Sequence, residues 1–329
     1  MTGVKILGTG TYLPERVVQN DDFAAFVDTS DEWIQSRTGM SRRHIASTDE
    51  PVWHMGAKAA EEALRNANLS AADIDMILVT TVTADFSTPS IACLIQGAIG
   101  AENAFAMDLN VACTGLAFAL DMARRYLATG DVGTVLLVCA EQLSQLTNYD
   151  DRSTCVLFGD GAAACVARAA EKPFAAFLKS DATGAQHIYS KKKLRSIPFF
   201  AGTEEHEPFP VESTGAIVMN GREVYKFATK AMPEAILNAC AKLGVALSDL
   251  VRIIPHQANI RILQTAAKNL GLPWEKIHVN IADYGNTSSA SIAIGLDECI
   301  RGGRINRGDL VCIVGFGAGL TYGACVFEY

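Results

Sequence analysis

The chain has 329 residues, of which 49% are hydrophobic and 19% charged, and its formal net charge is −8. This composition is too apolar for a disordered protein, and the acidic balance argues against a nucleic-acid binder. The start of the sequence has no secretion signal, and no apolar run is long enough to span a bilayer, so we expect a cytoplasmic protein without membrane contact.

The nine cysteines are spread singly, and no CxxC pair occurs. Such spacing is typical of reduced thiols and fits neither a disulfide framework nor a zinc site. We therefore expect no bound metal. The length favours two domains or one large duplicated unit.

An apolar segment at residues 4–7 predicts the first strand. The run Gly8-Thr9-Gly10 after it resembles the start of a dinucleotide-binding fingerprint, but the third glycine is absent and Pro14 interrupts the segment. These departures exclude a nucleotide loop. A short helix is expected next, over residues 21–27.

A second helix begins at the capping pattern of residues 29–32 and ends at Gly39. Within it Trp33 and Arg37 are four residues apart and share one face. An aromatic ring beside a guanidinium suits either a structural cation–π pair or a site for an adenine and a phosphate. The residues alone favour the structural pair.

The same order of elements occurs twice along the chain. A helix at 52–67, a Leu-Ser turn with an aspartate and a strand at 76–81 are matched by a helix at 228–243, a similar turn and a strand at 251–255. The interval from Cys113 to Gly130 equals that from Asn286 to Gly303, and a strand follows each (134–139 and 309–314). This repetition predicts an internally duplicated α/β unit.

The two halves meet in a less regular region at residues 171–215. It holds four prolines, the basic run Lys191-Lys192-Lys193 and the acidic run Glu204-Glu205-His206-Glu207. We expect loops with one or two strands there, anchored by apolar side chains (Phe174, Phe177, Ile188, Phe199 and Phe200).

Cys113 stands where a strand-like segment passes into an apolar helix that ends at Thr129. A helix N-terminus favours a thiolate and so predicts a lowered pKa for the thiol, although a lone cysteine there is more often a small core residue. His256 follows the strand at 251–255, and Asn286 stands at the junction matching Cys113. The residues alone leave acyl transfer, thiol-protease chemistry and a structural role open.

Three motifs resemble the active-site motifs of β-ketoacyl-[acyl carrier protein] synthase III, a family of thiolase-like condensing enzymes. They are Cys113 at its strand–helix junction, the run Pro255-His256-Gln257-Ala258-Asn259, and the run of residues 284–291 that holds Asn286. The resemblance extends to residues 31–39, 158–162 and 315–319, and is weakest at 172–215. It implies a thiolase-like α/β fold, in which two duplicated halves form a five-layered αβαβα core. We expect residues 1–171 to carry the cysteine and residues 172–329 the histidine and asparagine.

The resemblance also implies a mechanism. Cys113 takes an acyl primer from coenzyme A, and His256 and Asn286 stabilise the enolate that forms when malonyl-acyl carrier protein loses carbon dioxide. Backbone N–H groups of Cys113 and Ala318 hold the oxyanion. Coenzyme A thioester is a substrate here, no cofactor is implied, and the protein is expected to be a homodimer.

Further residues are matched to binding roles through the same resemblance. They are Trp33, Arg37, Arg152 and Asn259 for coenzyme A, and Lys226, Arg261 and Lys268 for the acidic carrier protein. Thr88 occupies a primer-pocket position where many members have phenylalanine, which favours a longer or bulkier primer. Ala318 replaces a usual glycine, which requires a negative φ there.

Other assignments remain open. A condensing enzyme or acyltransferase of secondary metabolism, with a different primer or acceptor, would share the fold and the three catalytic residues. A thioester hydrolase or a degenerate binding protein is disfavoured because no residue of the triad is missing. A thiolase proper is disfavoured because residues 316–320 contain no second cysteine.

Overall fold

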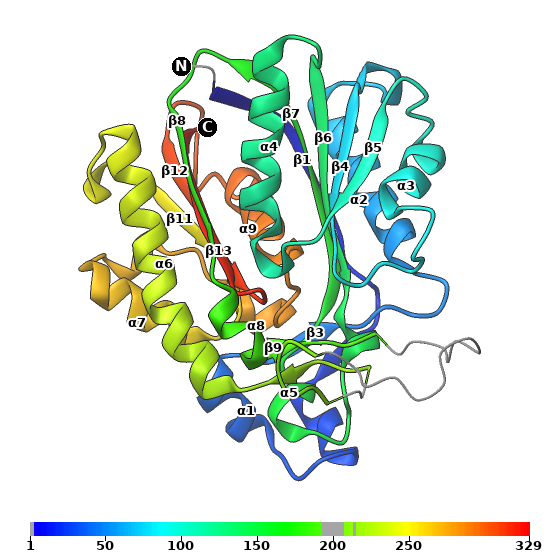
Figure 1. Cartoon of the computed structure of the whole chain (residues 1–329), viewed down its shortest axis with the longest axis vertical. Coiled ribbons are helices and arrows are strands. Elements are labelled where there is room, and N and C mark those ends of the chain that lie inside the picture. Colours follow the sequence, from blue (N-terminus) through cyan, green and yellow to red (C-terminus); the bar gives the residue numbers. More distant parts are fainter. Residues whose placement is uncertain (1–2, 193–206, 213–214) are drawn as a thin grey trace.

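The computed structural model describes residues 3–192, 207–212 and 215–329, and Figure 1 shows two sheets with helices between them and outside them. The expected anchors Phe199 and Phe200, together with Lys193, Glu204, Glu205 and His206, lie outside the described residues.

The first sheet has five strands in the order β1-β7-β6-β4-β5. β4, β5 and β6 run parallel, whereas β7 is antiparallel to both of its neighbours. Parallel neighbours require crossover connections, and α3 and α4 supply them. The strands are β1 (Gly3–Tyr12), β4 (Met76–Thr80), β5 (Phe105–Leu109), β6 (Thr134–Gln142) and β7 (Asp160–Ala170).

The second sheet repeats this order as β11-β12-β13-β8. β11 and β12 are parallel, and β13 is antiparallel to β12 and to β8. The counterpart of β5 is reduced to a single parallel bridge between Ile253 and Ile277. The predicted duplication is therefore confirmed. The strands are β8 (Phe174–Ser180), β11 (Arg252–Pro255), β12 (Leu310–Gly317) and β13 (Thr321–Glu328).

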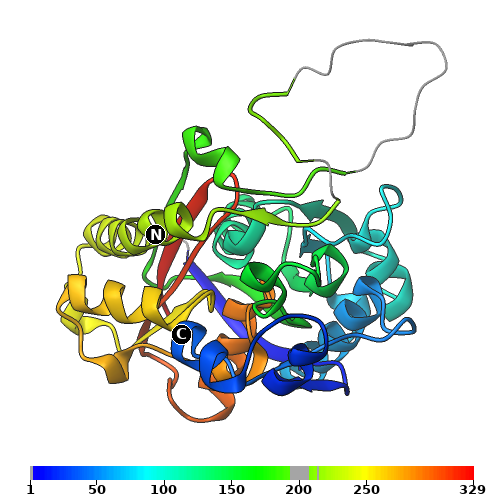
Figure 2. The same cartoon turned by 90° about the horizontal axis from the view of Figure 1, so that it is seen from below.

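Helices form three layers around the two sheets. α2 and α3 cover the outer face of the first sheet, α6 and α7 cover the outer face of the second, and α4 and α9 lie between the sheets (Figure 2). This is the five-layered αβαβα arrangement expected from the sequence. The helices are α2 (Val52–Ala67), α3 (Ile91–Ile99), α4 (Gly115–Thr129), α6 (Gly221–Leu243), α7 (Ile260–Leu270) and α9 (Ala290–Arg301).

The strands alternate their side chains between two apolar cores. On β4, Met76 and Leu78 pack in the central core with α4 and α9, whereas Ile77 and Val79 pack against α2 and α3. Successive strand residues point to opposite faces, so a sheet covered on both faces is apolar along its whole length. The central core joins the two halves, because both sheets contribute to it.

β1 is longer than the strand predicted at residues 4–7, and it includes both glycines of the rejected nucleotide motif. A Cβ on Gly8 would lie 2.4 Å from the backbone nitrogen of Ala67, and a Cβ on Gly10 would lie 2.4 Å from that of Ala63. The glycines therefore allow α2 to pack directly on the strand, and they form no nucleotide loop.

Two helix predictions need correction. The expected helix at 21–27 is a 3₁₀ segment at Asn20–Ala25, and α6 begins at Gly221 rather than at residue 228. The Asn220 side chain accepts a hydrogen bond from the backbone N–H of Glu223 at 3.3 Å, and this cap starts the helix about two turns earlier than predicted. Smaller elements are β2 (Val17–Gln19), α1 (Asp31–Thr38), β3 (Arg42–His44), α5 (Arg152–Cys155), β9 (Ile188–Tyr189), β10 (Val218–Met219) and α8 (Ile281–Tyr284).

The change from one sheet to the other falls between β7, which ends at Ala170, and β8, which begins at Phe174. A division of the chain between residues 171 and 172 remains a proposal that this change supports. Among the described residues, no helix is both long and apolar enough to cross a bilayer.

Candidate active site

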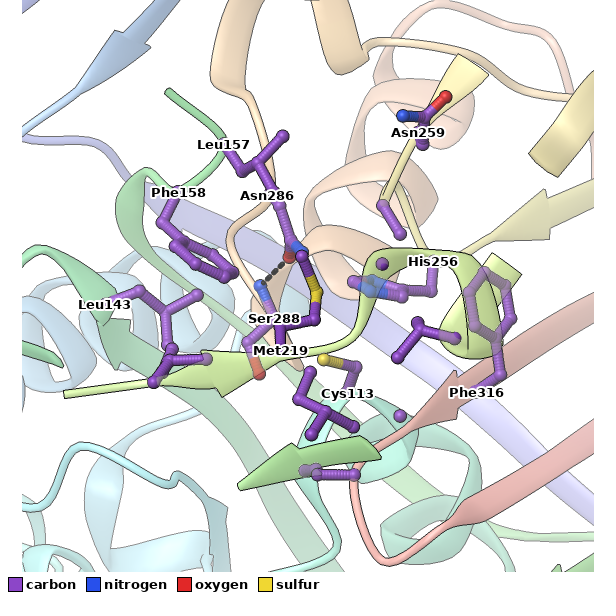
Figure 3. A pocket seen from close by; sticks show the side chains of 18 of the residues that line it. Cys113, Leu143, Leu157, Phe158, Met219, His256, Asn259, Asn286, Ser288 and Phe316 are labelled. Atoms are coloured by element: carbon purple, nitrogen blue, oxygen red, sulfur yellow. Dashed lines mark hydrogen bonds between the residues drawn. The ribbon is translucent and has the colours of Figure 1, made fainter. Parts of the chain in front are cut away.

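A cavity of about 690 Å³ lies between the halves and contains Cys113, His256 and Asn286 in its wall (Figure 3). Trp33 and the exposed Arg37 line the same cavity, so it reaches from the surface to the thiol. Most of the remaining wall is apolar, from Leu143, Leu157, Phe158, Met219 and Phe316 among others.

Cys113 lies in a 3₁₀ turn, Ala112–Thr114, which leads directly into α4. Ala112 before it has a φ of +48°, a left-handed value that is strained for a residue with a Cβ. Gly115 after it packs so closely that a Cβ would lie 2.6 Å from Oγ1 of Thr80. The strained backbone of Ala112 and the close packing of Gly115 fix the Cys113 thiol at the N-terminal end of α4.

Burial raises the pKa of the Cys113 thiol to about 12, and the nearby Glu141 carboxylate acts in the same direction. The lowered pKa predicted from the helix N-terminus is therefore wrong. Loss of hydration outweighs the dipole, because an unsolvated thiolate is unfavourable in an apolar cavity. Cys113 is a neutral thiol until a substrate or a neighbouring group stabilises its anion.

His256 is fully buried and follows β11 directly, as predicted. Its Nδ1 lies 2.8 Å from Oγ of Ser291, whose own hydrogen is donated to the backbone oxygen of Ser288 at 2.8 Å. Nδ1 is therefore the donor to Ser291, and the Nε2 lone pair is left for the cavity. Burial lowers the pKa of His256 to about 3, so the ring is neutral.

Asn286 is oriented by its own loop. Its Oδ1 accepts a hydrogen bond from the backbone N–H of Ser288 at 2.9 Å (Figure 3). Because the oxygen is engaged in this way, the amide NH₂ group remains as the donor toward the cavity. The loop is tied to the first half, since the N–H of Asn286 donates to the oxygen of Leu157 at 2.9 Å.

The turn after β12 passes next to the thiol. A Cβ on Gly317 would lie 2.8 Å from the backbone nitrogen of Cys113, so only glycine permits this approach. Ala318 is not among the described non-glycine residues with positive φ, which are Asn68, Ala112 and Ser288. Alanine is therefore tolerated at this position.

Two guanidinium groups lie over the ring of Trp33. The Arg37 carbon is 4.8 Å and the Arg152 carbon 4.7 Å from the ring centroid. The cation–π contact favoured by the spacing is thus present, and Arg152 joins it from a distant part of the sequence. Asn259 caps α7 and donates to the backbone oxygen of Arg37 at 3.1 Å, which brings all four residues to one side of the cavity.

The three basic residues expected to contact a carrier protein are exposed on α6 and α7. Lys226 pairs with Glu223 at 2.6 Å, and Arg261 donates to the backbone oxygen of Ser36 at 2.6 Å. Lys268 lies further along α7. Of the three, Arg261 lies against α1, whereas Lys226 is paired with an acidic residue of its own helix.

Thr88 is not in the wall of this cavity. It is exposed in the loop between β4 and α3, before Pro89, and its assignment to a primer pocket stays a prediction. The loop ends where the backbone N–H groups of Ile91 and Ala92, at the start of α3, donate to the Asp108 carboxylate on β5.

Sequence reasoning assigned no role to Ser288, Ser291 or Glu141. Ser288 and Ser291 belong to the same run as Asn286, and that proximity was the available signal. Glu141 stands within the apolar strand β6, and an acidic residue in an otherwise hydrophobic strand is the pattern that could have indicated a role.

The duplicated five-layered fold, with a cysteine at the start of one central helix and an asparagine at the matching junction of the other half, defines a thiolase-like condensing enzyme. Two family models of 3-oxoacyl-[acyl-carrier-protein] synthase III match the chain, one over residues 107–184 and the C-terminal one over residues 240–329. The β-ketoacyl-[acyl-carrier-protein] synthase III of Clostridium acetobutylicum is 44% identical over 100% of this chain and 99% of that protein. The chain belongs to the 3-oxoacyl-[acyl-carrier-protein] synthase III family.

Solved structures agree with this assignment. The crystal structure of 3-oxoacyl-[acyl-carrier-protein] synthase III from Aquifex aeolicus has a TM-score of 0.91 and 41% identity, covering 99% of this chain and 100% of that one. The priming β-ketosynthase of the R1128 polyketide pathway has a TM-score of 0.90 and 34% identity, covering 99% of this chain and 96% of that one.

Proposed function

We propose that the protein catalyses the decarboxylative condensation of an acyl-coenzyme A primer with malonyl-[acyl carrier protein], giving the 3-oxoacyl product that initiates fatty-acid synthesis. The observation that carries the proposal is the meeting of Cys113, His256 and Asn286 in one cavity, in a chain 44% identical to a synthase of this name. Each residue comes from a different segment, so only folding assembles them.

In the first half-reaction the sulfur of Cys113 attacks the thioester carbonyl of the acyl-coenzyme A. The new bond joins the acyl carbon to Cys113, and the bond to the coenzyme A sulfur breaks. The thiol proton passes to Nε2 of His256, whose lone pair is free because Nδ1 donates to Ser291. Coenzyme A leaves as a thiolate and is protonated by water. The backbone N–H groups of Cys113 and Ala318 hold the oxyanion.

In the second half-reaction malonyl-[acyl carrier protein] enters and loses carbon dioxide. Nε2–H of His256 and the amide NH₂ of Asn286 donate hydrogen bonds to its thioester oxygen, where the enolate charge develops. The carbanion attacks the acyl carbon on Cys113 and displaces the sulfur. The proton that His256 accepted in the first half-reaction then returns to Cys113.

Binding roles follow from position. Trp33, Arg37, Arg152 and Asn259 would hold the coenzyme A nucleotide at the outer end of the cavity, since a ring and two guanidiniums suit an adenine and phosphates. Lys226, Arg261 and Lys268 would contact the acidic carrier protein. We further propose a cytoplasmic homodimer that works without a cofactor.

The test is intact-mass analysis of the protein with acetyl- and longer acyl-coenzyme A, before and after malonyl-[acyl carrier protein] is added. We expect one acyl adduct on the wild type and none on Cys113→Ala. Variants His256→Ala and Asn286→Ala should retain the adduct when the malonyl substrate is added, because decarboxylation is lost. His256→Ala should also form the adduct more slowly than Asn286→Ala, because Nε2 is no longer present to accept the thiol proton. An adduct that persists in Cys113→Ala would exclude this residue as the nucleophile.

A second candidate is priming of a polyketide or other secondary metabolite. It is supported by the 34% identity to the R1128 priming β-ketosynthase over 99% of this chain. The same mass experiment separates the two: a carrier protein of fatty-acid synthesis should clear the adduct in the leading case, and only a pathway-specific carrier protein in the other.

A further inference from the structure

The Ser288 hydroxyl is a buried polar group without a partner. The side chain is 1% exposed, and its Oγ makes no hydrogen bond with any described atom. A buried hydroxyl left unpaired costs free energy, so such a group in a native site calls for a reason. Ser288 lines the cavity together with Cys113 (Figure 3), and the missing partner is therefore to be sought there.

The backbone holds Ser288 in place at a further cost. Its φ is +49°, in the left-handed region, and its N–H is bound by Oδ1 of Asn286 at 2.9 Å. Its carbonyl oxygen accepts the Ser291 hydroxyl. Strained residues of this kind concentrate where a side chain must be aimed. Both backbone polar groups are engaged, and only the hydroxyl is free.

Two acceptors lie near this hydroxyl. It acts on the Cys113 thiol in the direction that lowers its pKa, and on the Glu141 carboxylate in the same direction. Glu141 already has other donors: the N–H of Val82 at 3.0 Å and the hydroxyl of Ser289 at 2.8 Å. The sulfur has its own backbone N–H as a further donor but neither of these two, so its anion gains more from the Ser288 hydroxyl than the carboxylate does. Two other described titratable groups are close to Cys113. The negative charge of Glu141 disfavours the Cys113 thiolate, and His256, which is neutral, lines the same cavity.

We propose that Ser288 is a further catalytic residue, whose hydroxyl donates a hydrogen bond to the Cys113 sulfur whenever that sulfur carries negative charge. This inference rests on the proposed function. The hydrogen bond from Ser288 is made twice in the catalytic cycle. The first time is when the thiol proton moves to Nε2 of His256 as the sulfur attacks, and the second is when the sulfur is displaced from the acyl carbon. No proton leaves Ser288 in either step, so atoms and charges balance as before.

The test measures how readily the Cys113 thiol forms its thiolate. The rate of Cys113 alkylation by iodoacetamide is followed between pH 7 and 9 by mass spectrometry of the peptide that contains it, because the exposed Cys93 also reacts. Only the thiolate is alkylated. We expect Ser288→Ala to react about tenfold more slowly at each pH, the size of one charge-assisted hydrogen bond. Ser288→Gly, which relieves the positive φ, should be slowed equally.

Thr287→Val is the matched control. Thr287 is in the same loop, is 1% exposed and also has an Oγ1 without a described partner, but it does not line the cavity. We expect its alkylation rate to equal that of the wild type. Circular dichroism checks that all variants are folded.

Equal rates for Ser288→Ala, Ser288→Gly and the wild type would overturn the proposal, as would an equal slowing in Thr287→Val. The outcome is independent of the acyl donor. If the wild type accepts no acyl group but the Ser288 variants still alkylate slowly, the role of Ser288 stands and the proposed function fails.

Discussion

At the scale of single residues, the cavity holds two groups whose ionisation is governed by burial. The Cys113 thiol is shifted toward its neutral form with a pKa of about 12, and His256 toward its neutral form with a pKa of about 3. A site with two neutral groups suits substrates that bring their own charge. The malonyl carboxylate and the enolate supply it during the reaction.

His256 makes stability depend on pH in a defined direction. Its folded pKa of about 3 lies below the ordinary value of 6.5, so the unfolded chain binds a proton that the folded chain does not. Its contribution is complete above pH 6.5 and is lost progressively as pH falls toward 3. We expect the thermal unfolding midpoint to drop between pH 6.5 and 4.5.

The variant His256→Gln should lose less stability than the wild type over that range, because no imidazole is left to protonate. Differential scanning calorimetry of both proteins at matched pH gives the comparison. Parallel curves would contradict the assigned cause.

At the scale of elements, close backbone contacts determine where helices lie. The pairing of α2 with β1 depends on two glycines, since a Cβ on Gly10 would lie 2.4 Å from the nitrogen of Ala63. Such an atom cannot be accommodated without moving the helix. Gly97 in α3 has free space around it instead, because a Cβ there would meet no described atom within 4 Å.

We therefore expect Gly10→Ala to lower the free energy of unfolding by about 2–3 kcal/mol, in the range of overpacked cores. Gly97→Ala, within a helix, should raise it by about 0.5–1 kcal/mol because alanine is the better helix former. Urea unfolding followed by circular dichroism measures both changes. A loss of similar size in both variants would mean that glycine flexibility, and not the contact with α2, explains the effect.

At the scale of the whole molecule, the two halves share one core. Leu116 and Leu120 of α4 pack in the same cluster as Ile292 and Ile294 of α9, between the inner faces of both sheets. Neither half can bury the inner face of its sheet alone. A buried hydrogen bond, from Ser289 of the second half to Glu141 of the first at 2.8 Å, joins them next to the site.

We expect a fragment of residues 1–171 to remain unfolded or to aggregate when it is expressed alone, because it exposes the apolar side of α4. The full chain should unfold in a single transition. Size-exclusion chromatography and near-ultraviolet circular dichroism of the fragment check this expectation. A monomeric fragment with native-like near-ultraviolet signal would show that the halves fold independently.

The spacing of the sequence determined the duplication, and its resemblance to a known family supplied the layer order and the candidate catalytic residues. Matching spacings around Cys113 and Asn286 are local patterns, and the period of apolar residues distinguishes strand from helix without tertiary contacts. The boundaries that were wrong, at residues 21–27 and at the start of α6, depend on caps and short turns whose signals extend over only a few residues.

The tertiary structure decided what no local pattern contains. The pKa of Cys113 follows from desolvation by a cavity built from distant segments, and it outweighs the helix dipole that the sequence indicated. The exposed position of Thr88 follows from the path of a loop. The unpaired hydroxyl of Ser288 is defined only by what surrounds it. Burial and proximity are properties of the folded chain, because they depend on residues far apart in the sequence.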